Sequence, residues 1–262
     1  MRTLKLTLAY DGTAYAGWQV QPDRRTVQEV LQGVLAKITG QTVHAVASGR
    51  TDAGVHALGQ VASFRTESRL AAQVFRRALN AQLPDDITVI EAIDVPEEFH
   101  ALRDTLRKRY RYVIHDGPVR DIFARHYCWQ FYHGRLDAEA MHRAAQILQG
   151  THDFKSFETS GAERLSSVRT IFEIFVRRGE GPLGHVVTLE VEADGFLYNM
   201  VRTIVGCLVE VGRGVRDDAW IAQVLAAVDR RVAGATAPPQ GLFLVRVDYP
   251  ELPCESPTSL PD

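Results

Sequence analysis

Cysteine is scarce in this chain. Its 262 residues include only three cysteines, which lie far apart and form no C-x-x-C pair: Cys128, Cys207 and Cys254. So few and so separated cysteines argue against a disulfide framework and against a zinc site, and they are typical of the reducing cytoplasm. The sequence therefore predicts a cytoplasmic protein without a metal.

Long apolar runs are missing as well. A membrane helix needs about 18 consecutive apolar residues, and the best stretch, 196–211, is interrupted by Arg202 and Glu210. Polar and apolar residues alternate over 1–8, so the N-terminus lacks the apolar core of a signal peptide. We expect no membrane partner. Apolar residues still make up 45% of the chain, which is enough for a globular core.

An excess of positive charge is also missing. The formal net charge is −2, which by itself argues weakly against a nucleic-acid partner, because phosphates attract a positive face. Only four of the 30 basic residues are lysine, however, and arginine is the better residue for phosphate contacts and stacking. A dense basic run lies at 103–111. The alternative is an ordinary solvated surface in a protein from a G+C-rich genome.

The hydrophobic periodicity predicts an α+β fold in two halves. In the first half we expect a strand, a helix, two strands, a helix and a strand over 3–10, 27–38, 42–48, 59–65, 71–82 and 87–95. The second half repeats this order loosely, with strands at 109–115, 126–132, 168–177, 185–193 and 242–248 and helices at 137–149, 198–211 and 217–228. Each half is similar to the split β-α-β unit of ferredoxin-like and RNA-recognition domains, with a mainly antiparallel sheet.

These elements divide the chain into three parts. We expect an N-terminal half over 1–105, a C-terminal half over 106–249 and a disordered, proline-rich tail over 250–262. Two sheets placed edge to edge or face to face would leave a groove, with the basic run at the junction. Thr26 and Glu29 have the spacing of a capping box at the start of the first helix.

The segment 48–57, Ser-Gly-Arg-Thr-Asp-Ala-Gly-Val-His-Ala, is the most informative one and joins two predicted strands. Its two glycines allow a tight loop, and a loop fixed between strands can hold the Asp52 carboxylate rigidly. Two other interpretations stay open. Asp52 can bond its own backbone in a common turn. The glycine spacing also fits a phosphate loop, although Val55 and His56 stand where Lys-Ser/Thr is required.

Arg202 is the second informative residue. It shares its predicted helix face with Val205 and Val209, so we expect it to be partly buried near the start of that helix. The macrodipole disfavours a cation there, and a buried arginine requires a carboxylate partner. Either it forms an ordinary structural ion pair with Glu190 or Glu192, or it keeps a catalytic carboxylate ionised.

The strand predicted at 109–115 begins with Arg109, Tyr110, Arg111 and Tyr112. Alternation places the tyrosines on one face and the arginines on the other. One tyrosine can then stack on a base while Arg109 and Arg111 contact phosphates. Alternatively, the tyrosines belong to the core and the arginines are simply exposed.

Taken together, these segments resemble one family, the TruA-type tRNA pseudouridine synthases. The motifs that carry the resemblance run in order over nearly the whole chain: Tyr10-Asp11-Gly12-Thr13, Gly17-Trp18-Gln19, Thr26-Val27-Gln28, Gly49-Arg50-Thr51-Asp52-Ala53-Gly54-Val55-His56-Ala57, Phe99-His100-Ala101, Arg109-Tyr110-Arg111-Tyr112, Asp153-Phe154, Met200-Val201-Arg202 and Gly241-Leu242-Phe243-Leu244-Val245.

The resemblance implies the pseudouridine synthase fold, in which two α+β halves meet at a basic cleft. It implies an isomerase that breaks the N1–C1′ bond of a uridine, turns the base and joins C5 to C1′, without a metal or any other cofactor. A uridine stacked in a helix must be flipped out for this chemistry. The implied substrate is the anticodon stem-loop of tRNA at nucleotides 38, 39 and 40, and the implied assembly is a homodimer.

The resemblance also implies a role for each matching residue. Asp52 matches the catalytic aspartate, which acts as nucleophile or as base at the sugar. Tyr110 matches the tyrosine that packs on the flipped base and can take the C5 proton. Arg202 matches the basic residue that pairs with the aspartate, lowers its pKa and keeps it charged. Arg50 matches the arginine associated with base flipping.

A pocket residue and one departure complete the comparison with the family. Leu244, or alternatively Leu242, matches an apolar residue that lines the pocket. The family usually has His-Ala-Arg where this chain has His100-Ala101-Leu102-Arg103. The arginine is either shifted by one position or lost, which puts an RNA contact at this place in doubt.

Two other functions compete with this one. A non-catalytic RNA-binding protein could use the same split β-α-β units, but the usual aromatic signatures are missing from the predicted central strands. A hydrolase or glycosidase could use Asp52 together with Asp11, but it would need both acids to flank the bond, and it would release free uracil.

Overall fold

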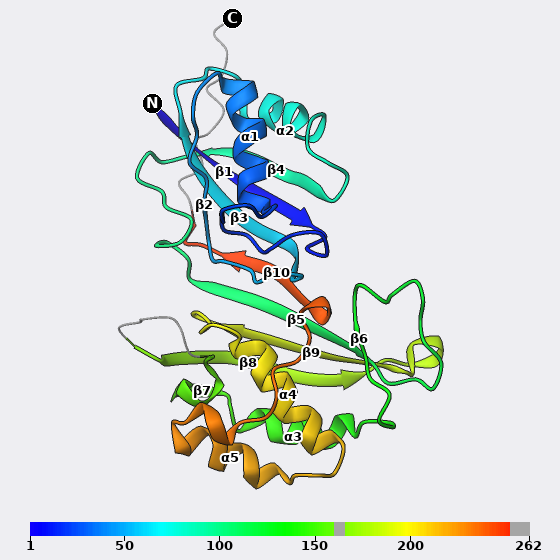
Figure 1. The fold of residues 1–262 in the computed structure, drawn as a ribbon. Helices are drawn as coiled ribbons and strands as arrows, with labels where there is room; N and C mark the ends of the chain where they lie inside the picture. Colours follow the sequence, from blue (N-terminus) through cyan, green and yellow to red (C-terminus); the bar gives the residue numbers. More distant parts are fainter. Residues whose placement is uncertain (160–165, 252–262) are drawn as a thin grey trace, which may run out of the picture.

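One continuous β-sheet runs through both halves of the computed structural model, which describes residues 1–159 and 166–251 (Figure 1). The main path is β4-β1-β3-β10-β5-β9-β8-β7, with β2 added to β3 and β6 to β5. The strands are β1 (Arg2–Tyr10), β2 (Val46–Ala47), β3 (His56–Thr66), β4 (Ile87–Val95), β5 (Arg107–His115), β6 (Trp129–Gln130), β7 (Gly150–Asp153), β8 (Val168–Arg178), β9 (Val186–Ala193) and β10 (Leu242–Asp248). Most pairs are antiparallel, which confirms the expected α+β class.

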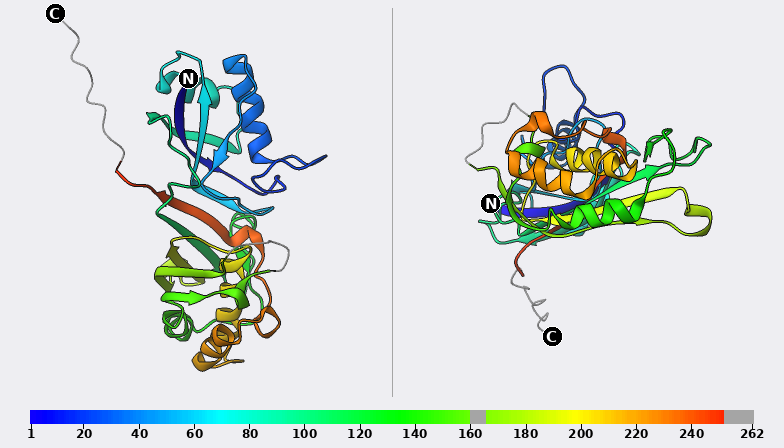
Figure 2. Two further views of the ribbon diagram at one scale, coloured as in Figure 1. Left: turned by 90° about the vertical axis from the view of Figure 1, so that its left-hand side faces the viewer. Right: turned by 90° about the horizontal axis from the view of Figure 1, so that it is seen from below.

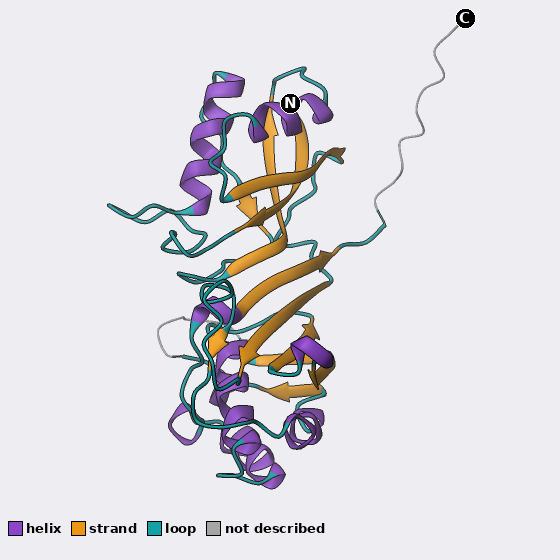
Figure 3. Cartoon of the chain, turned by 90° about the vertical axis from the view of Figure 1, so that its right-hand side faces the viewer, coloured by secondary structure: helices purple, strands orange, loops and turns teal. Residues whose placement is uncertain are grey.

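The last strand of the chain joins the two halves. β10 pairs in parallel with β3, where Leu244 lies opposite Ala57, and antiparallel with β5, where Leu244 lies opposite Tyr110. The two sheets are therefore joined edge to edge. Figures 2 and 3 show that β10 and β5 cross the middle of the molecule between the two sets of helices.

Five α-helices lie within the described residues, and each half of the sheet has its own set (Figure 1). Helices α1 (Val27–Thr39) and α2 (Ala72–Asn80) lie with the first half. Helices α3 (Ala138–Gln146), α4 (Met200–Gly212) and α5 (Asp218–Ala227) lie with the second.

Local side-chain bonds explain where these helices begin and end. Thr26 accepts a hydrogen bond from Glu29 N, as the predicted cap requires, and Gly40 ends α1 in the left-handed conformation with φ of 69°. Asp137 and Asp217 accept bonds from backbone N–H groups at the starts of α3 and α5. The predicted Thr26 cap is therefore confirmed.

Some predicted elements differ from the structure. The strand expected over 126–132 is reduced to the two residues of β6, and the helix expected over 137–149 ends at Gln146. Gly150, with φ of 107°, begins the unpredicted strand β7, which is held by pairing with β8 rather than by a local signal. The expected tail lies, from residue 252 onward, outside the described residues.

Candidate active site

The loop between β2 and β3 is held by the loop that follows β1. Trp18 N donates to Thr51 O (3.0 Å), and Gly54 N donates to Tyr15 O (3.3 Å). Gly17 has a φ of 97°, and a Cβ atom on it would lie 2.6 Å from Thr51 O. Only glycine fits so close an approach in this conformation. Two motifs that are distant in sequence therefore form one structural unit.

Asp52 lies in this loop and is paired with the first turn of α4. Arg202 Nη1 lies 3.4 Å from Asp52 Oδ2, so the arginine faces this carboxylate rather than a glutamate of β9. Arg202 Nε donates to Ala237 O and Arg202 Nη1 donates to Asn199 Oδ1, both at 2.7 Å. Asn199 stands before α4 in the left-handed conformation and makes no side-chain cap bond. Its side chain holds the guanidinium instead.

The pKa of Asp52 reflects two opposing effects. Burial raises the pKa above its ordinary value of 3.8, while the charge and the hydrogen bond of Arg202 lower it. Burial is the larger effect, so the net direction is upward. Arg202 lowers the pKa as expected, but it only limits the rise that burial causes and does not reverse it. A carboxylate of raised pKa is a better base or nucleophile.

The two tyrosines of β5 lie on one face, as alternation predicted. Tyr110 is nearly buried and meets Phe196 edge to face, with ring centroids 5.0 Å apart. Burial raises its pKa, with smaller contributions from Tyr10 and the Asp52 charge, so the phenol stays protonated at neutral pH. Tyr112 is fully buried and donates to Pro238 O (2.7 Å), which makes it a core residue.

A cleft of about 1130 Å³ brings together several of the predicted residues. Asp52, Arg202 and Tyr110 line it, and the exposed Arg50 stands at the same cleft. Of the two leucines considered, Leu242 is the one that lines it. Leu244 does not line the cleft, because it is completely buried in β10 opposite Tyr110. The cleft therefore combines an ionisable carboxylate, a cation and an aromatic ring.

Comparisons with known proteins agree with this geometry. The sequence profile of the family described as "tRNA pseudouridine synthase" matches residues 7–102 and 144–250. A protein named "tRNA pseudouridine synthase A" from Exiguobacterium sp. is 49% identical over 249 residues, which cover 95% of this chain and 98% of that protein. Its namesake from Thermoanaerobacter sp. (strain X514) is 45% identical over 95% of this chain and its own full length.

The chain belongs to the tRNA pseudouridine synthase family. It is accordingly an isomerase that acts on tRNA. A solved "H/ACA RNP bound to a substrate RNA containing 2'-deoxyuridine" matches 79% of this chain and 53% of its own, with 13% identity and a TM-score of 0.33. That likeness is too small to carry an argument.

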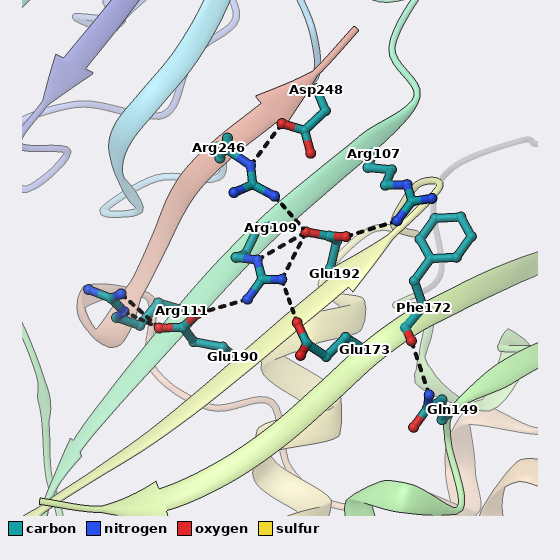
Figure 4. A network of polar contacts seen from close by, with 10 residues as sticks. All are labelled: Arg107, Arg109, Arg111, Gln149, Phe172, Glu173, Glu190, Glu192, Arg246 and Asp248. Carbon is teal, nitrogen blue, oxygen red and sulfur yellow. Dashed lines mark hydrogen bonds and ion pairs between the residues drawn. The ribbon is translucent and has the colours of Figure 1, made fainter. Parts of the chain in front are cut away.

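Arg109 and Arg111 are not brought to the cleft of this synthase. They lie on the opposite face of β5, in an ion-pair network drawn in Figure 4. Arg109 Nε donates to Glu192 Oε2 (3.0 Å), Arg111 Nη2 lies 2.7 Å from Glu190 Oε1, and Arg109 also pairs with Glu173. The two acids of β9 are only 5% exposed, and such buried carboxylates require cations beside them.

Two of the residues that line the synthase cleft were not among the predicted site residues. Lys108 and Phe196 both line it, and Lys108 Nζ donates to Ser48 O (2.5 Å) at the start of the loop before Asp52. Strand alternation could have identified Lys108, because it stands two residues before Tyr110 and so shares its face. Nothing local marks Phe196.

The departure from the family motif also has a structural meaning. Leu102 is 53% exposed and lines the cleft. Arg103 instead lines a separate hollow of about 570 Å³ and pairs with Asp104, with 2.7 Å between Arg103 Nε and Asp104 Oδ1. Arg103 therefore does not replace the usual arginine at the cleft of this synthase.

The competing hydrolase interpretation finds little support in this geometry. Asp11 is absent from the lining of the cleft. Its Oδ1 accepts from Thr13, and its Oδ2 accepts from Tyr127 at 2.7 Å, so it is occupied in holding the loop after β1.

Over residues 1–159 and 166–251, no cluster of three or more His, Cys, Asp or Glu side chains could hold a metal ion. In the same ranges, no helix is long and apolar enough to cross a membrane.

Proposed function

We propose that this enzyme converts uridine to pseudouridine at nucleotides 38, 39 and 40 in the anticodon stem-loop of tRNA. One observation carries the proposal: a part-buried carboxylate, Asp52, is paired with Arg202 at 3.4 Å in a cleft that Tyr110 also lines. The cleft is large enough for a flipped nucleotide, since ligand pockets of about 300–1,000 Å³ enclose molecules of that size.

Asp52 acts at C1′ of the flipped uridine, as nucleophile or as the base that removes a proton from the sugar. The N1–C1′ bond breaks, the uracil turns within the cleft, and C5 bonds to C1′; where Asp52 has bonded to C1′, that bond breaks in the same step. The proton on C5 passes to water and N1 takes up a proton from water, so the product is an isomer of the substrate. Either route requires the ionised carboxylate, and Arg202 limits the rise in pKa that burial causes.

Tyr110 packs on the uracil ring while the ring turns. Burial raises the pKa of its phenol, so the neutral hydroxyl is a poor base for the C5 proton and the ring serves mainly as a stacking surface. Arg50, exposed beside the cleft, assists base flipping and contacts the RNA backbone. Leu242 covers the apolar side of the pocket.

The enzyme is further proposed to be a cytoplasmic homodimer in which one tRNA contacts both subunits. This part of the proposal rests on the family resemblance. Light scattering on the purified protein, with and without tRNA, measures the mass directly, and a monomer at micromolar concentration would contradict it.

Tritium release tests the reaction. The purified protein is incubated with anticodon stem-loop transcripts that carry [5-³H]uridine at nucleotide 38, 39 or 40 only, and with a control transcript labelled elsewhere. We expect the wild type to release tritium from the first three without freeing uracil, and Asp52→Asn to release none. Asp85→Asn, which removes an exposed carboxylate after α2, is the matched control and should behave like the wild type.

The alternatives give different outcomes. Free uracil would indicate a glycosidase. A folded wild type that binds the stem-loop without releasing tritium would support the non-catalytic RNA-binding protein. Release from the control transcript alone would refute the assignment to nucleotides 38–40.

A further inference from the structure

A buried network of polar side chains lies beneath the loop that carries Asp52. Its members are Tyr10 at the end of β1, Gln60 in β3, and Ser48 and Thr51 in the loop, and none is more than 6% exposed. Buried polar groups are costly unless each has its partners, and none of these four has a role in the mechanism above. Their contacts indicate what they do.

Gln60 is bonded at both ends of its amide. Its Oε1 accepts from Ser48 Oγ (2.7 Å) and from Val61 N (3.1 Å). Its Nε2 donates to Gly49 O (3.0 Å) and to the Tyr10 hydroxyl (3.4 Å). The opposite amide orientation would set the amide nitrogen against the Val61 N–H donor and would leave Gly49 O without its donor, so the orientation is determined by chemistry.

Tyr10 links Gln60 to the loop. Its oxygen accepts from Gln60 Nε2, and its hydroxyl shares a hydrogen bond with Thr51 Oγ1, 2.8 Å away, in which either oxygen can donate. Burial raises the pKa of Tyr10 to about 12, so the hydroxyl keeps its proton at neutral pH. The chain of bonds thus runs from Gln60 through Tyr10 to Thr51, the residue directly before Asp52.

Gln60 and Tyr10 stand on the rigid part of the fold, in β3 and β1. β1 and β3 pair with one another, with Tyr10 opposite Ala57. Backbone bonds hold other points of the loop, including Ser48 N to Val61 O (2.8 Å). The Tyr10 bond is the contact that reaches the side chain next to Asp52, and a catalytic group is only as precise as the bonds that support it.

We propose that Tyr10 and Gln60 are positioning residues of this synthase: through Thr51 they set the place of the Asp52 carboxylate relative to C1′ of the substrate. The proposal rests on the proposed function of Asp52. Neither residue lines the cleft, so they act without touching the RNA. They should affect the chemical step and leave substrate binding unchanged.

The test measures kcat and KM for pseudouridine formation, and the Kd of a stem-loop RNA, for Tyr10→Phe. We expect kcat to fall by about 10- to 100-fold while KM and Kd stay within about threefold, because a misplacement of about 1 Å has effects of that size. Thr51→Val should give a similar loss, whereas Thr51→Ser, which keeps the hydroxyl, should restore the activity. The double variant Tyr10→Phe/Thr51→Val should be no worse than the worse single variant, since both changes remove one bond.

Ser156→Ala provides the control for a general loss of stability. Ser156 is fully buried in the second half, and its hydroxyl oxygen accepts from Asp229 N (2.9 Å), so the variant also removes one buried hydrogen bond. It should lower the melting temperature and leave kcat at the wild-type value. The melting temperature of every variant is measured, and activity is assayed at a temperature at which each variant is folded.

Three outcomes would overturn the inference. Tyr10→Phe could retain the wild-type kcat, the two single losses could multiply in the double variant, or Ser156→Ala could lose as much activity as Tyr10→Phe. An active wild type with an inactive Asp52→Asn and a fully active Tyr10→Phe would refute this inference and leave the proposed function intact. A wild type that forms no pseudouridine would refute both.

Discussion

Replacing Arg202 by methionine should move the acid limb of the pH–activity profile to higher pH. Activity requires ionised Asp52, whose pKa is already raised by burial and held back by Arg202. Without the arginine only burial remains, so the pKa rises further. The sign follows directly: activity is lost as pH falls through the Asp52 pKa, and the variant loses it at higher pH than the wild type.

The size of the effect follows from the separation of the pair. At 3.4 Å, two unit charges attract by about 1 kcal/mol in a water-like dielectric and by about 5 kcal/mol at an effective dielectric constant of 20. The Asp52 side chain is 28% exposed, so water can enter when Arg202 is removed and the lower end applies. Since each 1.4 kcal/mol is tenfold, the variant should lose at least about fivefold more activity on the acid limb than above it.

The assay compares kcat/KM of wild type and Arg202→Met over a pH series, using tritium release from the stem-loop. Methionine also removes the hydrogen bonds to Asn199 and Ala237, and this lowers activity equally at every pH. The effect of the charge is therefore the change, between low and high pH, in the ratio of wild-type to variant kcat/KM. Arg202→Lys keeps the cation and should retain the wild-type limb. A ratio of wild type to Arg202→Met that is the same at all pH values would refute the reasoning.

Three further predictions concern stability and RNA binding. Asp116→Asn should lower the free energy of unfolding, measured in urea at neutral pH, by about 3–5 kcal/mol, because it breaks a buried bidentate pair with Arg178. Burial alone would raise the pKa of Asp116, but the bonds from Arg178 and a backbone N–H hold it below 3.8, so the stability deficit of the variant should disappear as pH falls through that pKa. A deficit under about 1 kcal/mol at neutral pH would contradict the pair. Leu102→Arg should tighten stem-loop binding and steepen its dependence on log salt by about one unit, as measured by fluorescence anisotropy; an unchanged slope would mean that position 102 does not face phosphate. Gly206→Ala would place a Cβ atom 1.7 Å from Ala235 O, so thermal denaturation should show a loss of about 1–3 kcal/mol or more, and a variant as stable as the wild type would show that the backbone yields easily.

Local interactions made much of the fold predictable. The Thr26 cap of α1 depends on a neighbour within a few residues, and it is found. The alternation that places Tyr110 and Tyr112 on one face of β5 follows from strand geometry alone, and the burial pattern agrees with it. β7 was not predicted, because what holds it is pairing with β8.

The residues of the candidate site also differ in how far the sequence alone could predict them. The Asp52 segment could be recognised because its glycines and its motif are continuous in sequence. Arg202 could be expected to need a carboxylate, but the sequence offered Glu190 and Glu192 as well as Asp52. The choice between them depends on where α4 meets the loop after β2, and no short-range rule determines that.

By itself, the sequence determined the secondary structure that local bonds and side-chain periods encode, the loop that carries Asp52, and the family. Only the tertiary structure decided that β10 lies between β3 and β5, that Arg202 faces Asp52, and that Arg109 pairs with buried glutamates. Those outcomes depend on register and burial between segments far apart in the chain. The burial of Asp52, which also depends on the tertiary structure, raises the pKa of its carboxyl despite the neighbouring Arg202.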